Sequence, residues 1–231
     1  MIRPLFSYYG SKWRAVPRYP KPHHETIIEP FAGSAGYSLR YPDRRVILCE
    51  RDPLIAALWR YLIAVKPEEI RALPLIQLDQ TVDDFTLIPE AKSLIGFWLN
   101  KGSAQPRNMP SAWFRSGNYN HQFWGKEIRE RVAVSVDKIK HWQIIEGDYT
   151  SAPSLIQASW FIDPPYQDAG KHYKHGSKLI DYQQLSDWCQ SLSGQVMVCE
   201  NTGADWLPFA HLASIKSTKG KSKEALWLNH V

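Results

Sequence analysis

Short apolar runs of four or five residues alternate along this chain with longer stretches of helical periodicity. The short runs are rich in β-branched and aromatic side chains, as expected for buried strands. They predict five strands, at residues 26–29, 45–49, 142–146, 159–162 and 195–199. Helices are predicted at residues 53–65 and 182–192, where Asp52 and Asp181 are suited to cap the first turn. This alternation predicts an α/β fold with a mostly parallel sheet.

The alternation lapses between the second and third strands, over residues 66–140. Helical stretches remain within this segment at residues 67–73, 89–99 and 127–140. We therefore predict a discontinuous sheet domain, residues 1–65 and 141–231, with a helical and loop insertion at 66–140. Two more strand-like runs, 211–216 and 224–229, flank a Lys/Gly/Ser turn and predict a C-terminal antiparallel hairpin.

The composition is that of an ordinary globular protein, with 44% hydrophobic and 22% charged residues in a chain of 231. No run of 18 or more apolar residues occurs, and residues 1–4 lead into polar and aromatic positions rather than a signal core. We therefore expect no membrane association and a cytoplasmic location. The three cysteines, Cys49, Cys189 and Cys199, lie in apolar patterns and are predicted to be reduced core thiols.

Positive charge is unevenly distributed along the chain, whose net charge is +5. Residues 1–22 hold five Lys/Arg and no acid, and residues 216–223 hold four lysines and no acid. Residues 101–140 carry eight Lys/Arg against three acids, whereas residues 66–90 carry six acids and two bases. Such segregation suggests one side that faces a polyanion and one that faces solvent. Solvated loops are the alternative interpretation.

One apolar run, residues 160–162, ends abruptly in Asp163-Pro164-Pro165-Tyr166. Proline continues neither a sheet ladder nor a helix, so the strand must stop at Asp163. Two consecutive prolines also fix φ at about −65°, which holds the acid and the ring of Tyr166 at a set distance. This rigid pair is a candidate active site; the alternative is a strand end followed by ordinary turn residues.

Other predicted strands also end in acids, namely Glu29, Glu50 and Glu200. A turn with Phe31, Gly33 and Gly36 follows the first of these strands, and a helix-like run at residues 37–40 follows the turn, as in nucleotide-binding units. The dinucleotide fingerprint needs one more glycine, so a pyrophosphate is not indicated. Glu50 lies 21 positions after Glu29, near the spacing at which such folds bind ribose hydroxyls, and Asp52 is the weaker alternative for this role.

Cations and flat rings are interleaved in two loops, which suits phosphate contacts and base stacking. The predicted nucleic-acid contacts are Arg107, Trp113, Arg115 and Tyr119 in the insertion, and Lys171, Tyr173, Lys174 and His175 after the proline motif. The alternative for the insertion is a packed loop that covers a helical lobe. His172 and His175 have no accompanying Cys or carboxylate cluster, so no metal site is expected.

Taken in order, these motifs resemble the DNA adenine methylase (Dam-like, class α) group of S-adenosylmethionine-dependent N6-adenine methyltransferases, and most of all its short phage-type members. Tyr9-Gly10-Ser11-Lys12 resembles the N-terminal cofactor motif of the group, and residues 29–36 resemble its glycine motif, with Gly-Ser-Ala-Gly in place of the common Gly-x-Gly. Gly147-Asp148-Tyr149 resembles the motif that meets the cofactor adenine, and residues 163–166 resemble the catalytic tetrapeptide. The resemblance covers nearly the whole chain.

The resemblance implies a Rossmann-like methyltransferase sheet, S-adenosylmethionine as cofactor, and DNA as partner with its target adenine flipped out. The implied cofactor-binding residues are Tyr9, Gly10, Lys12, Glu29, Phe31, Gly33, Gly36, Glu50, Asp148, Tyr149 and Asp163. Lys12 would meet the methionine carboxylate and Glu29 the ammonium region. In the implied mechanism, the Asp163 carboxylate and the Pro164 carbonyl accept hydrogen bonds from the adenine amino group, and Tyr166 stacks on the base.

Two other functions remain open from the sequence. The same chemistry could act on RNA, since only the insertion would distinguish the two polymers. A catalytically silent DNA-binding protein could use the basic insertion and the loop after the proline motif. A nicotinamide-dependent oxidoreductase is the least favoured class, because the third glycine is missing. A monomer is favoured, and the residues that would read a particular DNA site are not identified.

Overall fold

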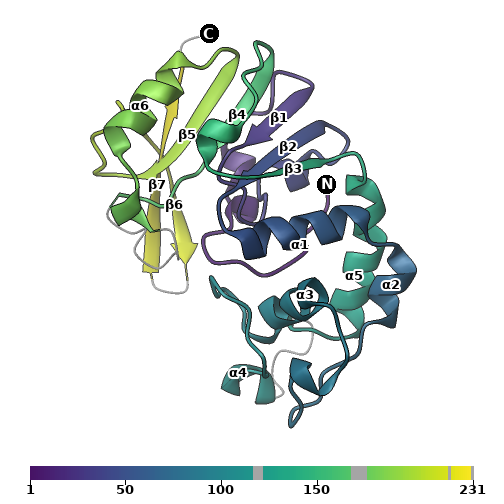
Figure 1. The fold of residues 1–231 in the computed structure, drawn as a ribbon. Helices are drawn as coiled ribbons and strands as arrows, with labels where there is room; N and C mark the ends of the chain where they lie inside the picture. Colours follow the sequence, from purple (N-terminus) through teal and green to yellow (C-terminus); the bar gives the residue numbers. More distant parts are fainter. Residues whose placement is uncertain (117–121, 168–175, 218–219, 230–231) are drawn as a thin grey trace.

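A seven-stranded sheet forms the centre of the computed structural model, which describes residues 1–116, 122–167, 176–217 and 220–229 (Figure 1). Its strands are β1 (Thr26–Glu29), β2 (Arg45–Glu50), β3 (Gln143–Glu146), β4 (Ala158–Ile162), β5 (Gln195–Asn201), β6 (Ala210–Ser217) and β7 (Gly220–Leu228). The strand order is β3-β2-β1-β4-β5-β7-β6, with β1 to β5 parallel and β7 antiparallel to both of its neighbours. This mixed sheet is typical of Rossmann-like methyltransferases, so the predicted fold class is confirmed.

The described α-helices are α1 (Pro53–Ala64), α2 (Pro67–Ala72), α3 (Pro89–Leu99), α4 (Ala112–Arg115), α5 (Lys126–Val136) and α6 (Tyr182–Ser191). They lie where the periodicity predicts them, except that α4 was not predicted and α5 ends four residues before the predicted boundary at residue 140. Asp52 accepts a hydrogen bond from the Leu54 amide at 3.1 Å, and Asp181 accepts one from the Gln184 amide at 3.0 Å, so both predicted caps are confirmed. The helix-like run after β1 is shorter than predicted, because it forms a single 3-10 turn, Ser38–Arg40.

The two faces of the sheet bury different sets of side chains, because successive residues of a strand point in opposite directions. In β4, Phe161 packs into a cluster that includes Trp59 of α1, whereas Trp160 and Ile162 pack into a second cluster with Leu185 of α6. Every residue of β1 and β4 is buried, which explains why these strands appear in the sequence as continuous apolar runs.

The insertion packs against the same face of the sheet as α1. Helix α3 contacts α1, and α2 contacts α5, so the first buried cluster runs without a break from the sheet into the insertion (Figure 1). The indole of Trp98 on α3 donates to the Leu5 carbonyl at 2.9 Å, and Arg71 on α2 pairs with Glu130 on α5 at 2.9 Å. The insertion is thus anchored to the N-terminal arm, residues 1–25, as well as to the sheet.

Two expectations from composition can be compared with the structure. Across the described part of the chain, none of the helices has the length and apolar character that a membrane span requires. Cys49, Cys189 and Cys199 are all buried and free, so the prediction of reduced core thiols is confirmed.

The N-terminal arm crosses the turn after β1 at very close range. An ideal Cβ at Gly36 would lie 2.7 Å from the Trp13 amide nitrogen and 3.0 Å from that of Lys12. These are backbone atoms, which cannot rotate away as a side chain would. Only glycine therefore lets the arm lie against the turn.

We predict that Gly36→Ala lowers the stability of the protein by about 1–3 kcal/mol, because the added methyl group must push the arm away from the turn. Thermal unfolding followed by circular dichroism measures the effect. Ser34→Ala, in the same turn, removes an atom instead of adding one and is the control, with wild-type stability expected. An unchanged unfolding temperature in Gly36→Ala would contradict the close approach described above.

Candidate active site

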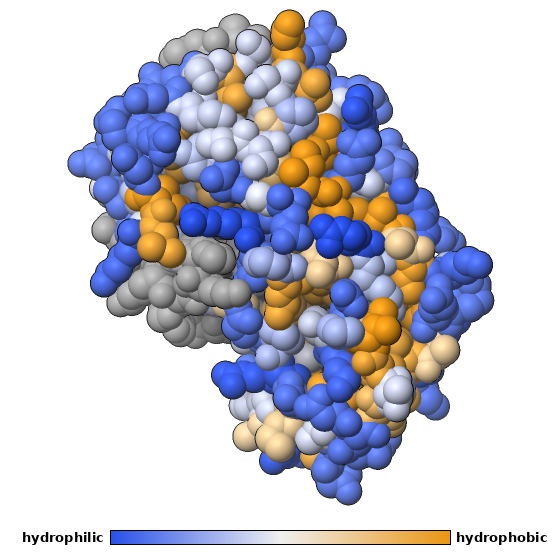
Figure 2. Space-filling view, in the orientation of Figure 1, coloured by the Kyte–Doolittle hydropathy of each residue, from blue (hydrophilic) through white to orange (hydrophobic). Residues whose placement is uncertain are grey.

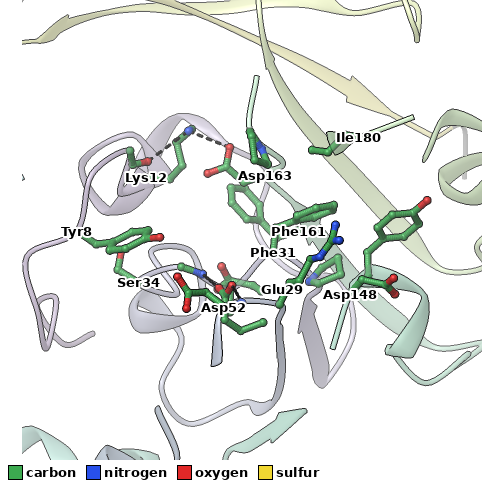
Figure 3. A pocket seen from close by; sticks show the side chains of 18 of the residues that line it. Tyr8, Lys12, Glu29, Phe31, Ser34, Asp52, Asp148, Phe161, Asp163 and Ile180 are labelled. Atoms are coloured by element: carbon green, nitrogen blue, oxygen red, sulfur yellow. Dashed lines mark hydrogen bonds and ion pairs between the residues drawn. The ribbon is translucent and has the colours of Figure 1, made fainter. Parts of the chain in front are cut away.

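A cavity of about 320 Å³ opens where β1, β2 and β4 end, between the sheet and the N-terminal arm (Figure 3). Its lining contains all eleven residues that were predicted to bind a cofactor, namely Tyr9, Gly10, Lys12, Glu29, Phe31, Gly33, Gly36, Glu50, Asp148, Tyr149 and Asp163. They come from five segments that are separate in the sequence. Parallel strands bring their carboxyl ends to one edge of a sheet, which explains how these segments meet.

Several lining residues were not among the predicted site residues. They include Tyr8, Ser11, Ser34, Phe161, Ile180 and Gln184. Asp52 was predicted as the weaker alternative to Glu50 for the ribose or as a helix cap, and it lines the cavity while it caps α1. Ile180 comes from the loop before α6, where Leu179 and Ile180 form an apolar run that is too short to give a signal of its own. These residues line the cavity because the fold brings them close to the predicted motifs. The only sequence signal for them is their position near a motif residue.

The turn after β1 is strained and closely tied to the end of β2. The Gly33 amide donates to Oε2 of Glu50 at 2.9 Å, and the Gly33 carbonyl accepts from the Trp59 indole at 2.8 Å. Gly33 has φ of +45°, and Ala35 has φ of +49°, a left-handed conformation that is unfavourable for alanine by roughly 1–2 kcal/mol. Alanine at position 35, in place of the second glycine of the common Gly-x-Gly motif, is therefore accommodated with backbone strain in this turn.

At the arm side of the cavity, Lys12 and Asp163 form an ion pair with Nζ and Oδ1 2.9 Å apart (Figure 3). Both side chains are largely buried, with exposed fractions of 10% and 19%. Burial raises the pKa of Asp163 to about 6, although the adjacent Lys12 ammonium lowers it. The carboxyl group is therefore mainly ionised at neutral pH and lies at the wall of the cavity.

Two further carboxyl groups lie at the strand ends, Glu29 buried and Glu50 partly buried. Glu29 is 2% exposed and accepts a hydrogen bond from the Ser38 amide at 2.7 Å, and burial raises its pKa to about 8. Glu50 accepts from the amides of Gly33 and Asp52, each at 2.9 Å, and burial raises its pKa as well. Backbone amides donate hydrogen bonds to both carboxyl groups, and these bonds stabilise an acid at the end of each strand.

Carboxyl groups outnumber basic groups among the described residues of the lining. These acids are Glu29, Glu50, Asp52, Asp148, Asp163 and Asp181, and these bases are Lys12 and Arg51. Buried carboxyl groups with raised pKa values are stabilised by a cation placed beside them. The cavity is therefore suited to a ligand that carries positive charge, and poorly suited to a pyrophosphate.

Aromatic rings form the other end of the cavity. Phe31 and Tyr149 are stacked, with centroids 5.6 Å apart and planes inclined by 23°. Asp148 lies beside them and accepts from the Thr150 amide at 3.0 Å, which caps the short turn that presents Tyr149. Two rings, a carboxylate and the side chain of Ile180 together suit a flat, partly polar group such as a purine.

Two of the three predicted catalytic residues, Pro164 and Tyr166, lie next to the cavity but are not among its lining residues, whereas Asp163 and Pro165 are. The Lys12 ammonium lies over the Tyr166 ring, 4.5 Å from its centroid. The Tyr182 hydroxyl at the start of α6 donates to the Pro165 carbonyl at 2.6 Å. The four-residue motif is thus held from both the arm and α6.

The predicted nucleic-acid contacts that the structure describes are on the surface of the insertion. Arg107 and Arg115 are exposed, and Trp113 is 59% exposed on α4, at the outer end of the insertion (Figure 1). Tyr119, Lys171, Tyr173, Lys174 and His175 lie outside the described residues. Figure 2 shows hydrophilic residues over most of one face of the molecule, with apolar residues in separate groups.

No cluster of three or more His, Cys, Asp or Glu side chains within the described ranges has the arrangement of a metal site. No family model matches this sequence, and a search of curated proteins finds no match to it. The geometry of the cavity and of its neighbouring surfaces is therefore what supports a function.

We predict that the stability of the protein falls as the pH rises from about 5 to 8, because folding raises the pKa of Glu29 from 4.5 to about 8. The folded state holds the proton of Glu29 over this range and the unfolded state releases it. The stabilisation is complete below the lower value and is lost as the pH passes the upper one. Denaturant unfolding at a series of pH values measures this slope.

Glu29→Gln should flatten that slope, because glutamine keeps the acceptor for the Ser38 amide and does not titrate. Part of the slope between about pH 4 and 6 should remain, since burial also raises the pKa of Asp163. Glu25→Gln, at an exposed carboxyl just before β1, is the matched control and should keep the wild-type slope. An identical slope in wild type and Glu29→Gln would rule out this account of Glu29.

Proposed function

We propose that this protein transfers a methyl group from S-adenosylmethionine to the N6 amino group of adenine in DNA. One observation carries the proposal: the eleven residues that resemble the cofactor-binding residues of the Dam-like group line a single cavity, with Asp163 in its wall. Lys12, Phe31 and Tyr149 come from distant parts of the chain, and nothing but the fold brings them together.

The cavity fits the chemistry of this cofactor. S-adenosylmethionine carries a sulfonium and an ammonium group, and the carboxyls of Glu29, which is buried, and Glu50, which is partly buried, suit positive charge. The stacked rings of Phe31 and Tyr149 suit its adenine, with Asp148 beside them as a hydrogen-bond acceptor. When bound, the cofactor would supply an electrophilic methyl group: the amine nitrogen gains the methyl group as the sulfonium–methyl bond breaks, S-adenosylhomocysteine leaves as a neutral thioether, and one proton of the amine is released to solvent.

The residues at the arm side fit the activation of an exocyclic amine. The amino group of adenine is a poor nucleophile, because its lone pair is delocalised into the ring. Hydrogen bonds from the amino group to the Asp163 carboxylate and the Pro164 carbonyl localise that lone pair and offset developing positive charge. The prolines hold both acceptors in place, and well-oriented proximity supplies roughly 7–11 kcal/mol.

The ion pair between Lys12 and Asp163 differs from the role that the resemblance implies for Lys12. In the resemblance, Lys12 meets the methionine carboxylate, whereas here its ammonium lies 2.9 Å from Asp163. A lysine in this place neutralises the buried carboxylate until an amine approaches, and it remains within reach of a ligand in the cavity that it lines. In this proposal Lys12 therefore serves both the acid and the cofactor.

The target base must leave its helix before the amino group can reach Asp163, since an atom within a duplex is inaccessible to a cavity of this kind. Exposed Arg107, Trp113 and Arg115 on the insertion offer cations for phosphates and a ring for stacking. A face that is mainly hydrophilic is consistent with a polar polymer as partner (Figure 2).

We expect the wild-type protein to transfer labelled methyl groups from S-adenosylmethionine to plasmid DNA that lacks N6-methyladenine. Asp163→Asn should lower the rate roughly 100-fold or more, because the change removes a charged acceptor and keeps the shape. The dissociation constant of the cofactor should stay near the wild-type value, because the amide oxygen can still accept a hydrogen bond from Lys12 and so keep the arm in place. Asp163→Ala tests the same point without an amide. Scintillation counting measures transfer, and calorimetry measures cofactor binding.

Asp187→Asn, at an exposed position on α6, is the matched control and should transfer at the wild-type rate. Wild-type turnover in both Asp163 variants would refute the assignment of Asp163. Preferential labelling of RNA would indicate that RNA, and not DNA, is the substrate. Binding of DNA without any methyl transfer would indicate a catalytically silent DNA-binding protein.

We further predict that Arg115→Ala weakens DNA binding and lowers the slope of log affinity against log salt by about 1, as expected when one phosphate contact is lost. Arg71→Ala, also on the insertion, is the control, because its guanidinium is already paired with Glu130 at 2.9 Å. Fluorescence anisotropy of a labelled duplex at several salt concentrations measures both slopes. Equal slopes for the wild type and Arg115→Ala would exclude Arg115 from the contact.

A further inference from the structure

A buried carboxylate on the C-terminal hairpin holds the tyrosine of the Asp-Pro-Pro-Tyr motif. The Tyr166 hydroxyl donates to Oε2 of Glu224 at 2.6 Å. Glu224 is only 6% exposed and lies in β7, opposite Asn201 of β5 and Ala213 of β6. The two residues are 58 positions apart in the sequence, and nothing in the motif itself indicates this contact.

The distance is that of a charge-assisted hydrogen bond between a hydroxyl and a carboxylate, which is stronger than a bond between neutral groups. The same Oε2 atom also accepts from the Tyr19 hydroxyl on the N-terminal arm, at 3.2 Å. Tyr19 is itself buried and meets Phe161 of β4 edge to face, with centroids 5.2 Å apart. Glu224 thus joins the arm, the motif and the hairpin at one atom.

The prolines of the motif do not fix the Tyr166 ring, because they constrain the backbone and leave the side-chain torsions of the tyrosine free. Two contacts restrain the ring instead. The Lys12 ammonium lies over one face at 4.5 Å from the centroid, and Glu224 binds the hydroxyl at the far edge. These two contacts, one at a face of the ring and one at its hydroxyl, restrict the orientation of the Tyr166 ring plane.

Burying a carboxylate in a sheet is unfavourable unless its hydrogen bonds are made, and an apolar residue would fill the same space at lower energy. The neighbouring strand carries a second example. Glu200 at the end of β5 is fully buried and accepts from the Gln167 amide, directly after the motif, at 3.1 Å. Glu224 and Glu200 therefore both accept hydrogen bonds from the segment that begins with Asp163 and contains Tyr166.

We propose that Glu224 is a positioning residue, which holds the Tyr166 ring in the plane in which it stacks on the target base. This inference rests on the proposed function, because the stacking role of Tyr166 belongs to it. Glu224 touches neither the cofactor cavity nor the reacting atoms, and it acts through the hydroxyl of Tyr166. The C-terminal hairpin thereby becomes part of the base-binding site.

The test compares Glu224→Met, which removes the acceptor at similar length, with Glu224→Gln, which keeps one. We expect Glu224→Met to lower kcat for plasmid DNA on the order of 10- to 100-fold, since small misplacements of reacting groups have effects of this size. Glu224→Gln should stay within about 3-fold of the wild type, because its carbonyl oxygen still accepts from Tyr166. The dissociation constant and stoichiometry for S-adenosylmethionine should be unchanged in both variants, which a general loss of structure would alter.

Tyr166→Phe keeps the ring and removes only the hydroxyl, so it should lower kcat about as much as Glu224→Met. Combined, the two changes should have no further effect, because they break the same bond. Tyr19→Phe is the matched control, since it removes the other donor to the same oxygen and should keep the wild-type kcat. If Glu224→Met does not fold, Tyr166→Phe and Tyr19→Phe still decide the matter.

Wild-type kcat in Tyr166→Phe, or losses that multiply in the double variant, would overturn the positioning role and leave the proposed function intact. A wild-type protein that transfers no methyl group to DNA or RNA would overturn the proposed function, and the positioning role with it. These outcomes are distinguishable, because the first requires active wild-type protein and the second requires its inactivity.

Discussion

The ion pair between Lys12 and Asp163 is the contact on which the arrangement of this site depends. It joins the N-terminal arm to the end of β4 across a distance of 2.9 Å, with both side chains largely withdrawn from water. A buried carboxylate without this cation would be far less favourable, and the arm would have less reason to lie over the sheet. The Lys12 ammonium also lies over the Tyr166 ring, 4.5 Å from its centroid.

Negative charge is the second constraint, and it connects stability to binding. Glu29, Glu50 and Asp163 are held by backbone amides or by Lys12, yet burial raises the pKa of each. These groups make the folded state less stable than an apolar lining would, so their placement is understandable if they bind something. A cationic ligand restores part of that energy, because it favours the ionised forms.

The two halves of the sheet contribute differently. The parallel half, β1 to β4, carries the cavity at its carboxyl edge, as expected for an open α/β sheet. None of the described residues of the antiparallel hairpin of β6 and β7 lines the cavity, yet the hairpin supplies Glu224 to the Tyr166 hydroxyl. The insertion packs on the same face as α1 and presents Trp113 to solvent.

The sequence by itself determined the strands, the caps and the grouping of the motif residues, because these follow from local rules. Apolar runs mark buried strands, Asp52 and Asp181 mark helix starts, and acids at parallel strand ends must share one edge. The grouping of Glu29, Glu50 and Asp163 could be predicted for this reason, whereas the full set of eleven predicted residues in the lining was implied by the resemblance to the Dam-like group. Their roles toward a ligand remain a proposal.

Only the tertiary structure decided which contacts form between segments that are distant in the sequence. The bond between Tyr166 and Glu224 spans 58 positions, and Lys12 faces Asp163 because the arm crosses the turn at Gly36. Glu29 accepts a hydrogen bond from the amide of Ser38, the first residue of the single 3-10 turn after β1, and Ala35 just before this turn is left-handed. No local pattern encodes such contacts, because each depends on the packing of segments that are distant in the sequence.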